Sequence, residues 1–316
     1  MDCTLIKSIE YEVSWYSNIF ATIILAMKYA IILALVFLAS CSPSSLSTPE
    51  PKAQAYIENK GSDTMVNLAL AWAEKYQADH SDVSLSVTGG GSGTGIAALI
   101  NGTVDIANAS RQIKEEETEL AEEKGIQPVE FVVARDAIAV IVNPENPVSE
   151  LSLQQISDIY SGKIMTWTEV GGENRPIVRL SRETNSGTHV YFLETVLRLG
   201  DKNNKTFFSD DTLLLPSSEG IIAEVRQNPN AIGYDGLGYV PPDIKKLAIA
   251  RKPGEPYILP SAVTVNDNSY PIARDLYMYI SGQPTGFVKS YLEWILSPQA
   301  QEIVTELGFV PLKVKQ

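Results

Sequence analysis

Apolar and polar residues alternate with two different periods along this chain, one typical of helices and one typical of strands. Between residues 65 and 76 apolar side chains recur at three- and four-residue spacing, which predicts a helix that buries one face. Residues 83–87 alternate apolar and polar side chains, which predicts a strand, and the glycine-rich stretch 89–95 leads from it into a second helix. Strands that alternate with helices predict a mostly parallel sheet covered on both faces.

The same alternation resumes in the second half of the chain, after a turn-rich segment at 143–147. Ser152 and Gln155 have the spacing of a capping box, which marks the start of a helix that ends near Gly162. The other predicted elements are buried strands at 131–133 and 137–142, strands at 104–107, 177–180 and 231–234, an acidic helix at 114–124, a helix from Thr188, and amphipathic helices at 287–296 and 299–307. The pattern is that of an α/β protein, and 316 residues suffice for two domains.

The N-terminal 40 residues have the features of a secretory signal. Met27-Lys28 forms a short basic start, residues 29–38 are apolar, and Leu38-Ala39-Ser40-Cys41 resembles the bacterial lipobox, in which cleavage precedes a lipidated cysteine. We therefore expect cleavage before Cys41, and a Ser- and Pro-rich tether over 41–54 that holds the protein on the periplasmic or extracellular side of a membrane.

The alternative for this N-terminal segment is a membrane-spanning helix over 19–39, which is long enough to cross a bilayer. That helix would place Lys28 within the apolar interior at a considerable cost in free energy. We favour the lipoprotein signal, and we expect translation to start at Met27, which makes residues 1–26 an N-terminal extension.

Charge and composition exclude several classes of function. The formal net charge of −13 argues against a nucleic-acid-binding protein, because such proteins need clustered Lys and Arg to displace counterions from phosphates. With two cysteines, Cys3 and Cys41, and two histidines, we expect no disulfide framework, no metal centre and no cofactor. An anionic ligand of so acidic a chain must be held by local geometry.

Three loops combine hydroxyl groups with the start of a predicted helix: Ser62-Asp63-Thr64, Ser92-Gly93-Thr94 and Ser186-Gly187-Thr188. The first amides of a helix lack intrahelical partners and the helix dipole favours negative charge there, so each loop has the features of an anion site. The alternative for any one loop is an N-cap without a ligand. Arg182, four residues before Ser186, favours the anion site because its forked, permanent charge suits a tetrahedral oxyanion.

Enzyme signatures fit these loops poorly. The stretch 89–95 lacks the Gly-Lys-Ser/Thr ending of a P-loop, and Thr94 stands where a nucleophile elbow around Ser92 would need a glycine. His189 is the base nearest to Ser186 in sequence, but adjacent positions at a helix start point in different directions. A secreted serine-type or phosphoester hydrolase that uses Ser92 or Ser186 remains an alternative, as does a sensor or adhesin.

Several short motifs also follow one another in a fixed order. They are Gly61-Ser62-Asp63-Thr64-Met65, Gly89 to Gly95, Asp105-Ile106-Ala107 with Ala109-Ser110-Arg111, Asp158 to Gly162 followed by Trp167, Arg182 with Ser186-Gly187-Thr188, Ala231 to Tyr234, and Gly308 to Leu312. In this order the chain resembles the phosphate-binding lipoproteins of bacterial phosphate ABC transporters. The resemblance implies a type II periplasmic-binding-protein fold, in which two α/β lobes, each a mostly parallel sheet flanked by helices, are joined by two crossing strands. Lobe I would hold residues 55–136 and 269–316, and lobe II residues 137–268.

The resemblance also implies a function and a set of site residues. The function is capture of inorganic phosphate between the lobes for delivery to the permease subunits of an ABC importer, by a monomer anchored at Cys41 and without chemistry on the ligand. The implied phosphate contacts are Ser62, Asp63, Thr64 and Ser92 from one lobe and Arg182, Ser186, Gly187 and Thr188 from the other. Ser110 and Arg111 are further candidates, although well-studied members have Ala-Ser-Asp where this chain has Ala109-Ser110-Arg111.

Asp63 is our candidate for discrimination between phosphate and sulfate. A carboxylate beside an anion is repulsive unless a proton lies between them, and monohydrogen phosphate carries such a proton whereas sulfate does not. The alternative is that Asp63 only caps the helix beginning at Thr64.

Overall fold

The computed structural model describes residues 55–313, so the predicted signal, Cys41 and the whole tether lie outside the described residues. The strands are β1 (Ala55–Gly61), β2 (Val83–Thr88), β3 (Ile106–Ala109), β4 (Pro128–Val142), β5 (Glu150–Ser152), β6 (Val178–Arg182), β7 (Leu213–Leu215), β8 (Ala231–Gly236), β9 (Lys245–Lys246), β10 (Ala248–Ala250) and β11 (Ala273–Ser281). The α-helices are α2 (Asp63–Asp79), α3 (Ser92–Ile100), α4 (Glu115–Glu123), α5 (Leu153–Tyr160), α6 (Gly187–Phe192), α7 (Ser218–Gln227), α8 (Ala262–Asn266), α9 (Gly286–Ile295) and α10 (Pro298–Glu306). A π-helical turn, Leu193–Leu197, continues α6, and short 3₁₀ turns lie at Trp167–Val170 and Leu237–Tyr239. Within 55–313 no helix is both long and apolar enough to cross a membrane.

The main sheet has the strand order β2-β1-β3-β11-β4-β8-β6-β7, with β9 added on β4. The pairs β1–β2, β1–β3, β6–β8 and β6–β7 are parallel, as the alternation of strands and helices predicts. The pairs that involve the long strands β4 and β11 are antiparallel. The α/β prediction is therefore confirmed, with parallel pairs in each half and antiparallel strands between them.

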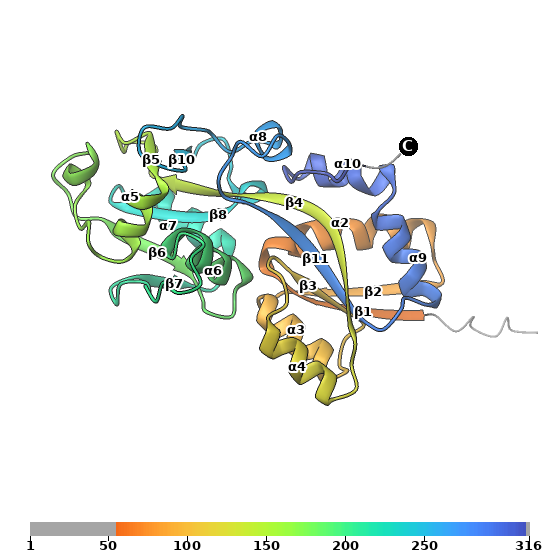
Figure 1. The fold of residues 1–316 in the computed structure, drawn as a ribbon. Coiled ribbons are helices and arrows are strands. Elements are labelled where there is room, and N and C mark those ends of the chain that lie inside the picture. Colours follow the sequence, from red (N-terminus) through yellow and green to blue (C-terminus); the bar gives the residue numbers. More distant parts are fainter. Residues whose placement is uncertain (1–54, 314–316) are drawn as a thin grey trace, which may run out of the picture. The chain divides into compact units, whose positions relative to one another are not determined.

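Strands β4 and β11 run side by side between the two halves of the sheet (Figure 1). β4 pairs with β11 through Ala137 and with β8 from Ile138 onward. The prediction of two separate strands at 131–133 and 137–142 was wrong, because β4 is one continuous strand. The polar residues that interrupt its apolar run, Arg135 and Asp136, do not end the strand, since each forms an ion pair with β11.

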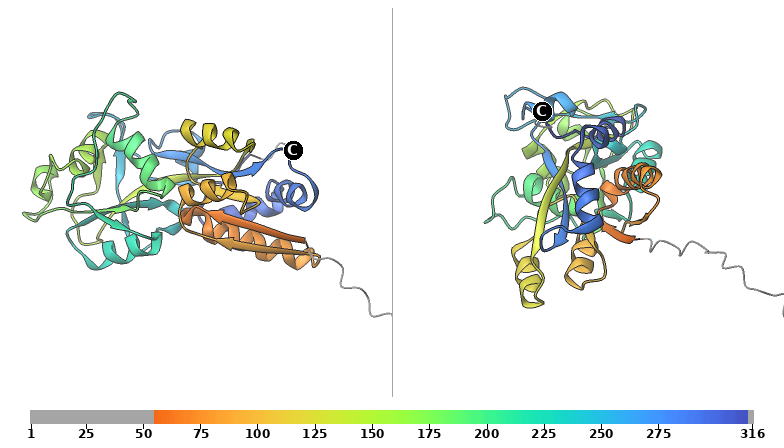
Figure 2. Two further views of the ribbon diagram at one scale, coloured as in Figure 1. Left: turned by 90° about the horizontal axis from the view of Figure 1, so that it is seen from below. Right: turned by 90° about the vertical axis from the view of Figure 1, so that its right-hand side faces the viewer.

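Helices cover both faces of each half, as predicted from strand periodicity. Along β3, Ile106 packs in a core with α2, α9 and α10, whereas the next residue, Ala107, packs in a second core with α3. Figure 2 shows α9 and α10 (blue) beside α2 (orange). Along β8, Ile232 belongs to a core with α5 and α6, and its neighbour Ala231 to one with α7.

Helix starts follow the local sequence closely. Ser152 Oγ accepts a hydrogen bond from the Gln155 amide while the Gln155 side chain bonds the Ser152 amide, so the capping box at α5 is confirmed. α2 begins at Asp63 and α3 at Ser92, each directly after a strand and loop. This arrangement points the first turns of both helices to the same end of the parallel strands.

Candidate anion-binding site

The three hydroxyl-rich loops identified in the sequence all lead into helices. Ser62 is the N-cap residue of α2, Gly91 that of α3 and Ser186 that of α6. Gly91 has a φ of 89°, a left-handed conformation that favours glycine. Ser186 Oγ accepts a hydrogen bond from the Thr188 amide at 3.2 Å, so this serine does act as a cap.

The fold brings the first and third loops into contact. Thr64 Oγ1 and Thr188 Oγ1 lie 2.8 Å apart, and neither side chain is exposed. Thr64 lies on the helix after β1 and Thr188 on the helix after β6, and these two strands lie toward opposite ends of the main sheet. The two halves of the sheet therefore meet at this contact. The structure therefore brings these two predicted site residues together.

The second loop lies against the third. The Gly93 amide donates to the carbonyl oxygen of Asn185 at 3.0 Å, and the Asn185 side chain donates to the Gly90 carbonyl oxygen at 3.0 Å. Gly187 packs so closely against Ser92 and Ser110 that any side chain there would clash with both hydroxyl groups. The glycine of the Ser-Gly-Thr motif is therefore required by close approach.

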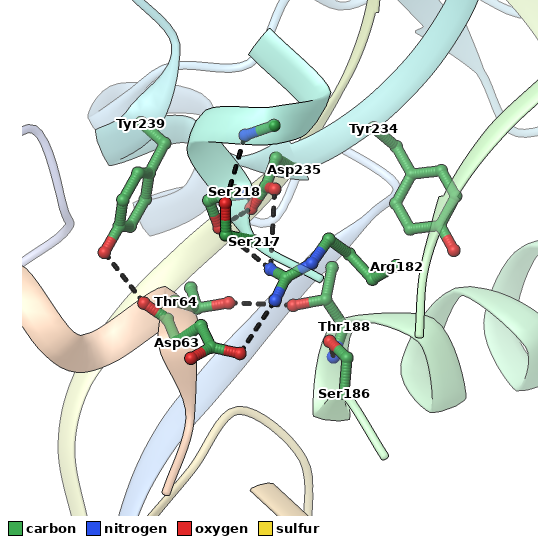
Figure 3. Close-up of polar contacts among 12 residues, drawn as sticks. Asp63, Thr64, Arg182, Ser186, Thr188, Ser217, Ser218, Tyr234, Asp235 and Tyr239 are labelled. Carbon is green, nitrogen blue, oxygen red and sulfur yellow. Dashed lines mark hydrogen bonds and ion pairs between the residues drawn. The ribbon is translucent and has the colours of Figure 1, made fainter. Parts of the chain in front are cut away.

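Arg182, the last residue of β6, lies at the centre of the site with 1% of its side chain exposed (Figure 3). Its Nη2 donates to Asp63 Oδ2 at 2.8 Å and to the Pro216 carbonyl oxygen at 2.9 Å, and its Nη1 donates to Ser218 Oγ at 2.9 Å. The buried Nε has no hydrogen-bond partner among the residues that the structure describes. A buried donor of this kind requires an acceptor, so Nε is available to an anion.

Asp63 connects the two halves through both its side chain and its main chain. Its Oδ2 pairs with Arg182, its Oδ1 accepts from the Gly90 amide at 2.9 Å, and its carbonyl oxygen accepts from the Tyr239 hydroxyl at 2.7 Å (Figure 3). Since α2 begins at Asp63, the carboxylate is not the N-cap that the alternative interpretation assumed. The neighbouring Ser62 hydroxyl is buried and has no partner within 55–313.

A second carboxylate, that of Asp235 in β8, lies behind Arg182. It is fully buried, its Oδ1 accepts from Ser218 Oγ at 3.0 Å, and its Oδ2 lies 3.7 Å from Arg182 Nη1. Burial raises the pKa of Asp235, although the charge of Arg182 opposes the shift. Arg182 thus lies between two carboxylates, which fix its guanidinium group in place.

Ser110 and Arg111, at the end of β3, differ in how they relate to this site. The Ser110 amide donates to Ser92 Oγ at 3.0 Å, which places it beside the second loop. Arg111 instead forms a two-point ion pair with Glu117 of α4, at 2.7 and 2.8 Å. Burial raises the pKa of Glu117, but hydrogen bonds from Arg111 and the Lys114 amide outweigh it and lower that pKa. The geometry of Arg111 is therefore that of an ion-pair partner of Glu117.

Sequence reasoning missed several polar residues of the site. Ser218 and Asp235 hold Arg182, and Asn185 joins two loops. Asn185 and Asp235 directly adjoin the motifs Ser186-Gly187-Thr188 and Ala231 to Tyr234, whereas Ser218 stands in a segment without a motif. Arg274, on β11, reaches both Thr64 and Thr188. Arg274 and Asp275 are two adjacent charged residues at the start of an otherwise apolar strand, and local periodicity does not place either of them in a buried site.

A cleft of about 780 Å³ opens beside the site, and Arg274 is part of its lining. The basic residues that line it are Arg111, Lys114, Arg135, Arg198 and Arg274, and the acidic ones are Glu115, Glu116, Glu194 and Asp275. The lining therefore carries no excess of negative charge, in contrast to the chain as a whole with its −13. No cluster of metal-binding side chains occurs in the part of the chain that the structure describes.

Comparison with known proteins shows which family has this sequence and architecture. Residues 46–299 match the PBP superfamily domain. The phosphate-binding protein PstS of Pseudomonas aeruginosa is 32% identical over 276 residues, which cover 82% of this chain and 84% of that protein. PstS of Bacillus subtilis is 32% identical over 272 residues, which cover 86% and 85% of the two chains.

Solved structures agree with these sequence matches. A putative phosphate ABC transporter substrate-binding protein from Clostridium perfringens, with bound phosphate, superposes with a TM-score of 0.73 at 31% identity and covers 82% of this chain and 100% of that one. An ABC-type phosphate transport receptor from Vibrio cholerae gives a TM-score of 0.66 at 27% identity, with coverage of 81% and 100%. This chain therefore belongs to the PBP superfamily and, within it, to the family of the phosphate-binding proteins PstS.

Proposed function

We propose that this protein captures inorganic phosphate and delivers it to the permease of an ABC importer. The relatives and structural neighbours named above, which include a protein with bound phosphate, support this function. The observation that carries it is that buried donors where the two halves meet, among them Ser62 Oγ at the start of α2 and Arg182 Nε at the end of β6, have no partner within 55–313. Unpaired buried donors are costly unless a ligand supplies the acceptor.

Phosphate would be held between two lobes, residues 55–136 with 269–316 and residues 137–268. In this proposal Ser62, Asp63, Thr64 and Ser92 contact it from the first lobe, and Arg182, Ser186, Gly187 and Thr188 from the second. Supporting this division, β4 changes its pairing partner from β11 to β8 between Ala137 and Ile138. Ser110 lies close enough to Ser92 to be a further contact, whereas the pairing of Arg111 with Glu117 makes it a weaker candidate.

Calorimetric titration of the purified protein with phosphate, arsenate, sulfate and molybdate tests this function. We expect one phosphate per chain, arsenate bound in competition with it, and much weaker binding of sulfate. The absence of any heat with phosphate, in a preparation freed of endogenous ligand by unfolding and refolding, would refute the proposal.

The contacts of the candidate serines do not favour a hydrolase. Ser92 Oγ accepts from the Ser110 amide and Ser186 Oγ accepts from the Thr188 amide, while His189 Nδ1 bonds Ser181 at 3.0 Å. Burial also lowers the pKa of His189. In this arrangement the imidazole is engaged away from both serines, so it is not placed to activate either one. Sustained turnover of a chromogenic phosphoester or ester would reverse this conclusion.

We further propose that the protein is a monomer held at the membrane by a lipid on Cys41, with Ser- and Pro-rich residues up to 54 as the tether. The support is the lipobox-like Leu38-Ala39-Ser40-Cys41. In Cys41→Ser we expect neither lipidation nor cleavage. Mass spectrometry of the wild-type protein purified from membranes checks this, and an unmodified Cys41 would contradict the proposal.

A further inference from the structure

One buried arginine outside the three loops touches both halves of the candidate site. Arg274, on β11, has 2% of its side chain exposed and lies opposite Asp136 of β4 in the strand register. Its Nη2 is 3.0 Å from Thr188 Oγ1 and 3.4 Å from Thr64 Oγ1, and its Nη1 donates to the Ser110 carbonyl oxygen at 2.9 Å. A single guanidinium group therefore connects the starts of α2 and α6 with the end of β3.

Thr64 and Thr188 each carry one hydroxyl proton, and the hydrogen bond between them uses only one of the two. Each hydroxyl has one proton and can accept two hydrogen bonds, and at 2.8 Å one of Thr64 and Thr188 donates to the other. Arg274 can only donate, so it cannot take the remaining proton. Among the described residues, the remaining proton has no acceptor in the hydrogen bonds of this pair.

We propose that Arg274 is a positioning residue of the phosphate site, which acts through Thr64 and Thr188. One Nη2 proton goes to Asp136 and the other is shared between the two hydroxyl oxygens, so that Arg274 occupies one lone pair on each and directs the free hydroxyl proton toward the bound anion. It also fixes the distance between the starts of α2 and α6. This inference rests on the proposed function, because the acceptor of that proton is taken to be phosphate.

The charge of Arg274 is largely balanced within its own surroundings. Asp136 Oδ2 accepts from Nη2 at 3.0 Å and from Nε at 3.3 Å, and this carboxylate is fully buried. The ring of Tyr191 lies 5.6 Å from the guanidinium carbon. Since Asp136 neutralises it locally, Arg274 contributes orientation of the hydroxyls and little net attraction for an anion.

The same two strands provide a matched control. Arg135 of β4 pairs with Asp275 of β11 at 3.3 Å, one position along the ladder from the Arg274–Asp136 pair. The other side-chain hydrogen bonds of Arg135 go to the Val265 carbonyl oxygen and Asn268 Oδ1, which belong to none of the three hydroxyl-rich loops. Removing Arg135 thus takes an arginine and an ion pair from the crossing strands without disturbing the threonines.

The experiment is a double-mutant cycle on phosphate affinity, measured by calorimetry on the purified full chain. The variants are Arg274→Gln, Thr188→Val and the double mutant, with Arg135→Gln as the control. We expect Arg274→Gln to weaken binding by about tenfold in the wild-type background, and by less than about threefold when Thr188 is already valine. Arg135→Gln should bind phosphate as the wild type does.

The outcomes separate this inference from the proposed function. If the wild type binds no phosphate, the function itself fails. If the wild type binds and Arg274→Gln binds equally well, or loses the same factor in both backgrounds, the positioning role is refuted. If Arg274→Gln does not fold, Arg274→Lys replaces it, since an ammonium can still pair with Asp136 but cannot span both hydroxyls and Ser110. Wild-type affinity in a folded Arg274→Lys, or failure of both variants to fold, would also overturn the proposal.

Discussion

Two buried arginines, each paired with an aspartate, hold the candidate site in different ways. Arg182 pairs with Asp63, which lies 119 positions away in sequence and is 22% exposed. Arg274 pairs with Asp136 on the neighbouring strand, and both side chains are essentially inaccessible. The first pair therefore joins the two halves of the site at a place that solvent reaches, and the second is built into the strands that run between them.

This difference indicates a division of labour. Arg182 retains an unpartnered Nε that can donate a charged hydrogen bond to an anion, whereas Arg274 has donors committed to Asp136, Ser110 and the two threonines. Direct donation to the anion and positioning of the hydroxyl groups are thus assigned to separate residues. The predictions below test this separation, beginning with the largest expected effect.

Replacing Arg182 by alanine should have the largest effect, because it removes the anion's charged partner and leaves Asp235 buried without its counterion. Loss of one partner of a buried ion pair costs about 3 to 5 kcal/mol of folding stability. Loss of a charged hydrogen bond to phosphate should weaken binding by at least about tenfold. Thermal unfolding and calorimetry, the latter well below the unfolding midpoint, measure the two effects.

The control for this prediction is Arg179→Ala on the same strand. Arg179 is also buried and pairs with Asp211 at 2.9 Å, yet it contacts none of the three anion loops. Arg179→Ala should lower the free energy of unfolding, and the folded variant should bind phosphate as the wild type does. An Arg182→Ala protein that is folded and binds normally would remove Arg182 from the site.

Asp136 should give the stability of the protein a distinctive pH dependence. Burial raises the pKa of Asp136 from 3.8 to about 6, although Arg274 and the Leu237 amide oppose the shift. Between about pH 4 and pH 6 the folded state then holds a proton that the unfolded state has released, so this group makes stability fall as pH rises through that window. A shift of about two pKa units corresponds to about 3 kcal/mol, and the contribution is constant above about pH 6.

Asp136→Asn isolates this contribution from those of other carboxyl groups. Denaturant titration from pH 4 to 7 gives the free energy of unfolding of the wild type and of Asp136→Asn. As pH falls, the stability of the wild type should rise relative to that of Asp136→Asn. A difference that stays constant across this range would mean that Asp136 is ionised throughout, and that its pairing with Arg274 outweighs burial.

The two arginines also show how far the sequence could predict this molecule. Arg182 stands four residues before a Ser-Gly-Thr motif at a helix start, so local chemistry identifies it. Arg274 lies in a strand, and its proposed role depends on the strand register that places it opposite Asp136. That register also brings it to Thr64 and Thr188, which are distant from it in sequence. Local periodicity therefore predicts helices, strands and caps well, but the crossing strand β4 was divided in two because its inter-strand ion pairs are long-range contacts.

Asp63→Asn should change selectivity more than affinity. The amide keeps the size of the side chain, but its single oxygen can accept from the Gly90 amide or from Arg182 and not from both, while its NH2 group can donate a hydrogen bond to a fully ionised anion. We expect sulfate to gain relative to phosphate by about tenfold, because the repulsion between two negative groups is removed. In a competition titration, an unchanged ratio would show that Asp63 only orients Arg182.

Replacing Arg111 by alanine should have the smallest effect, and it completes the comparison among the buried arginines. Arg111 is 7% exposed, and its two-point pairing with Glu117 commits both terminal nitrogens, with Nη1 also donating to the Gln112 carbonyl oxygen. Its buried Nε, like that of Arg182, has no partner among the described residues. Its positive charge is therefore balanced on α4, and we expect Arg111→Ala to change phosphate affinity by less than about threefold. Glu117→Gln provides the complementary test, because it leaves Arg111 without its counterion while the arginine remains beside Gly93. If Glu117→Gln strengthens phosphate binding and Arg111→Ala weakens it by tenfold, the charge of Arg111 reaches the anion, and the separation of direct donation from positioning drawn for Arg182 and Arg274 would have to include a third arginine.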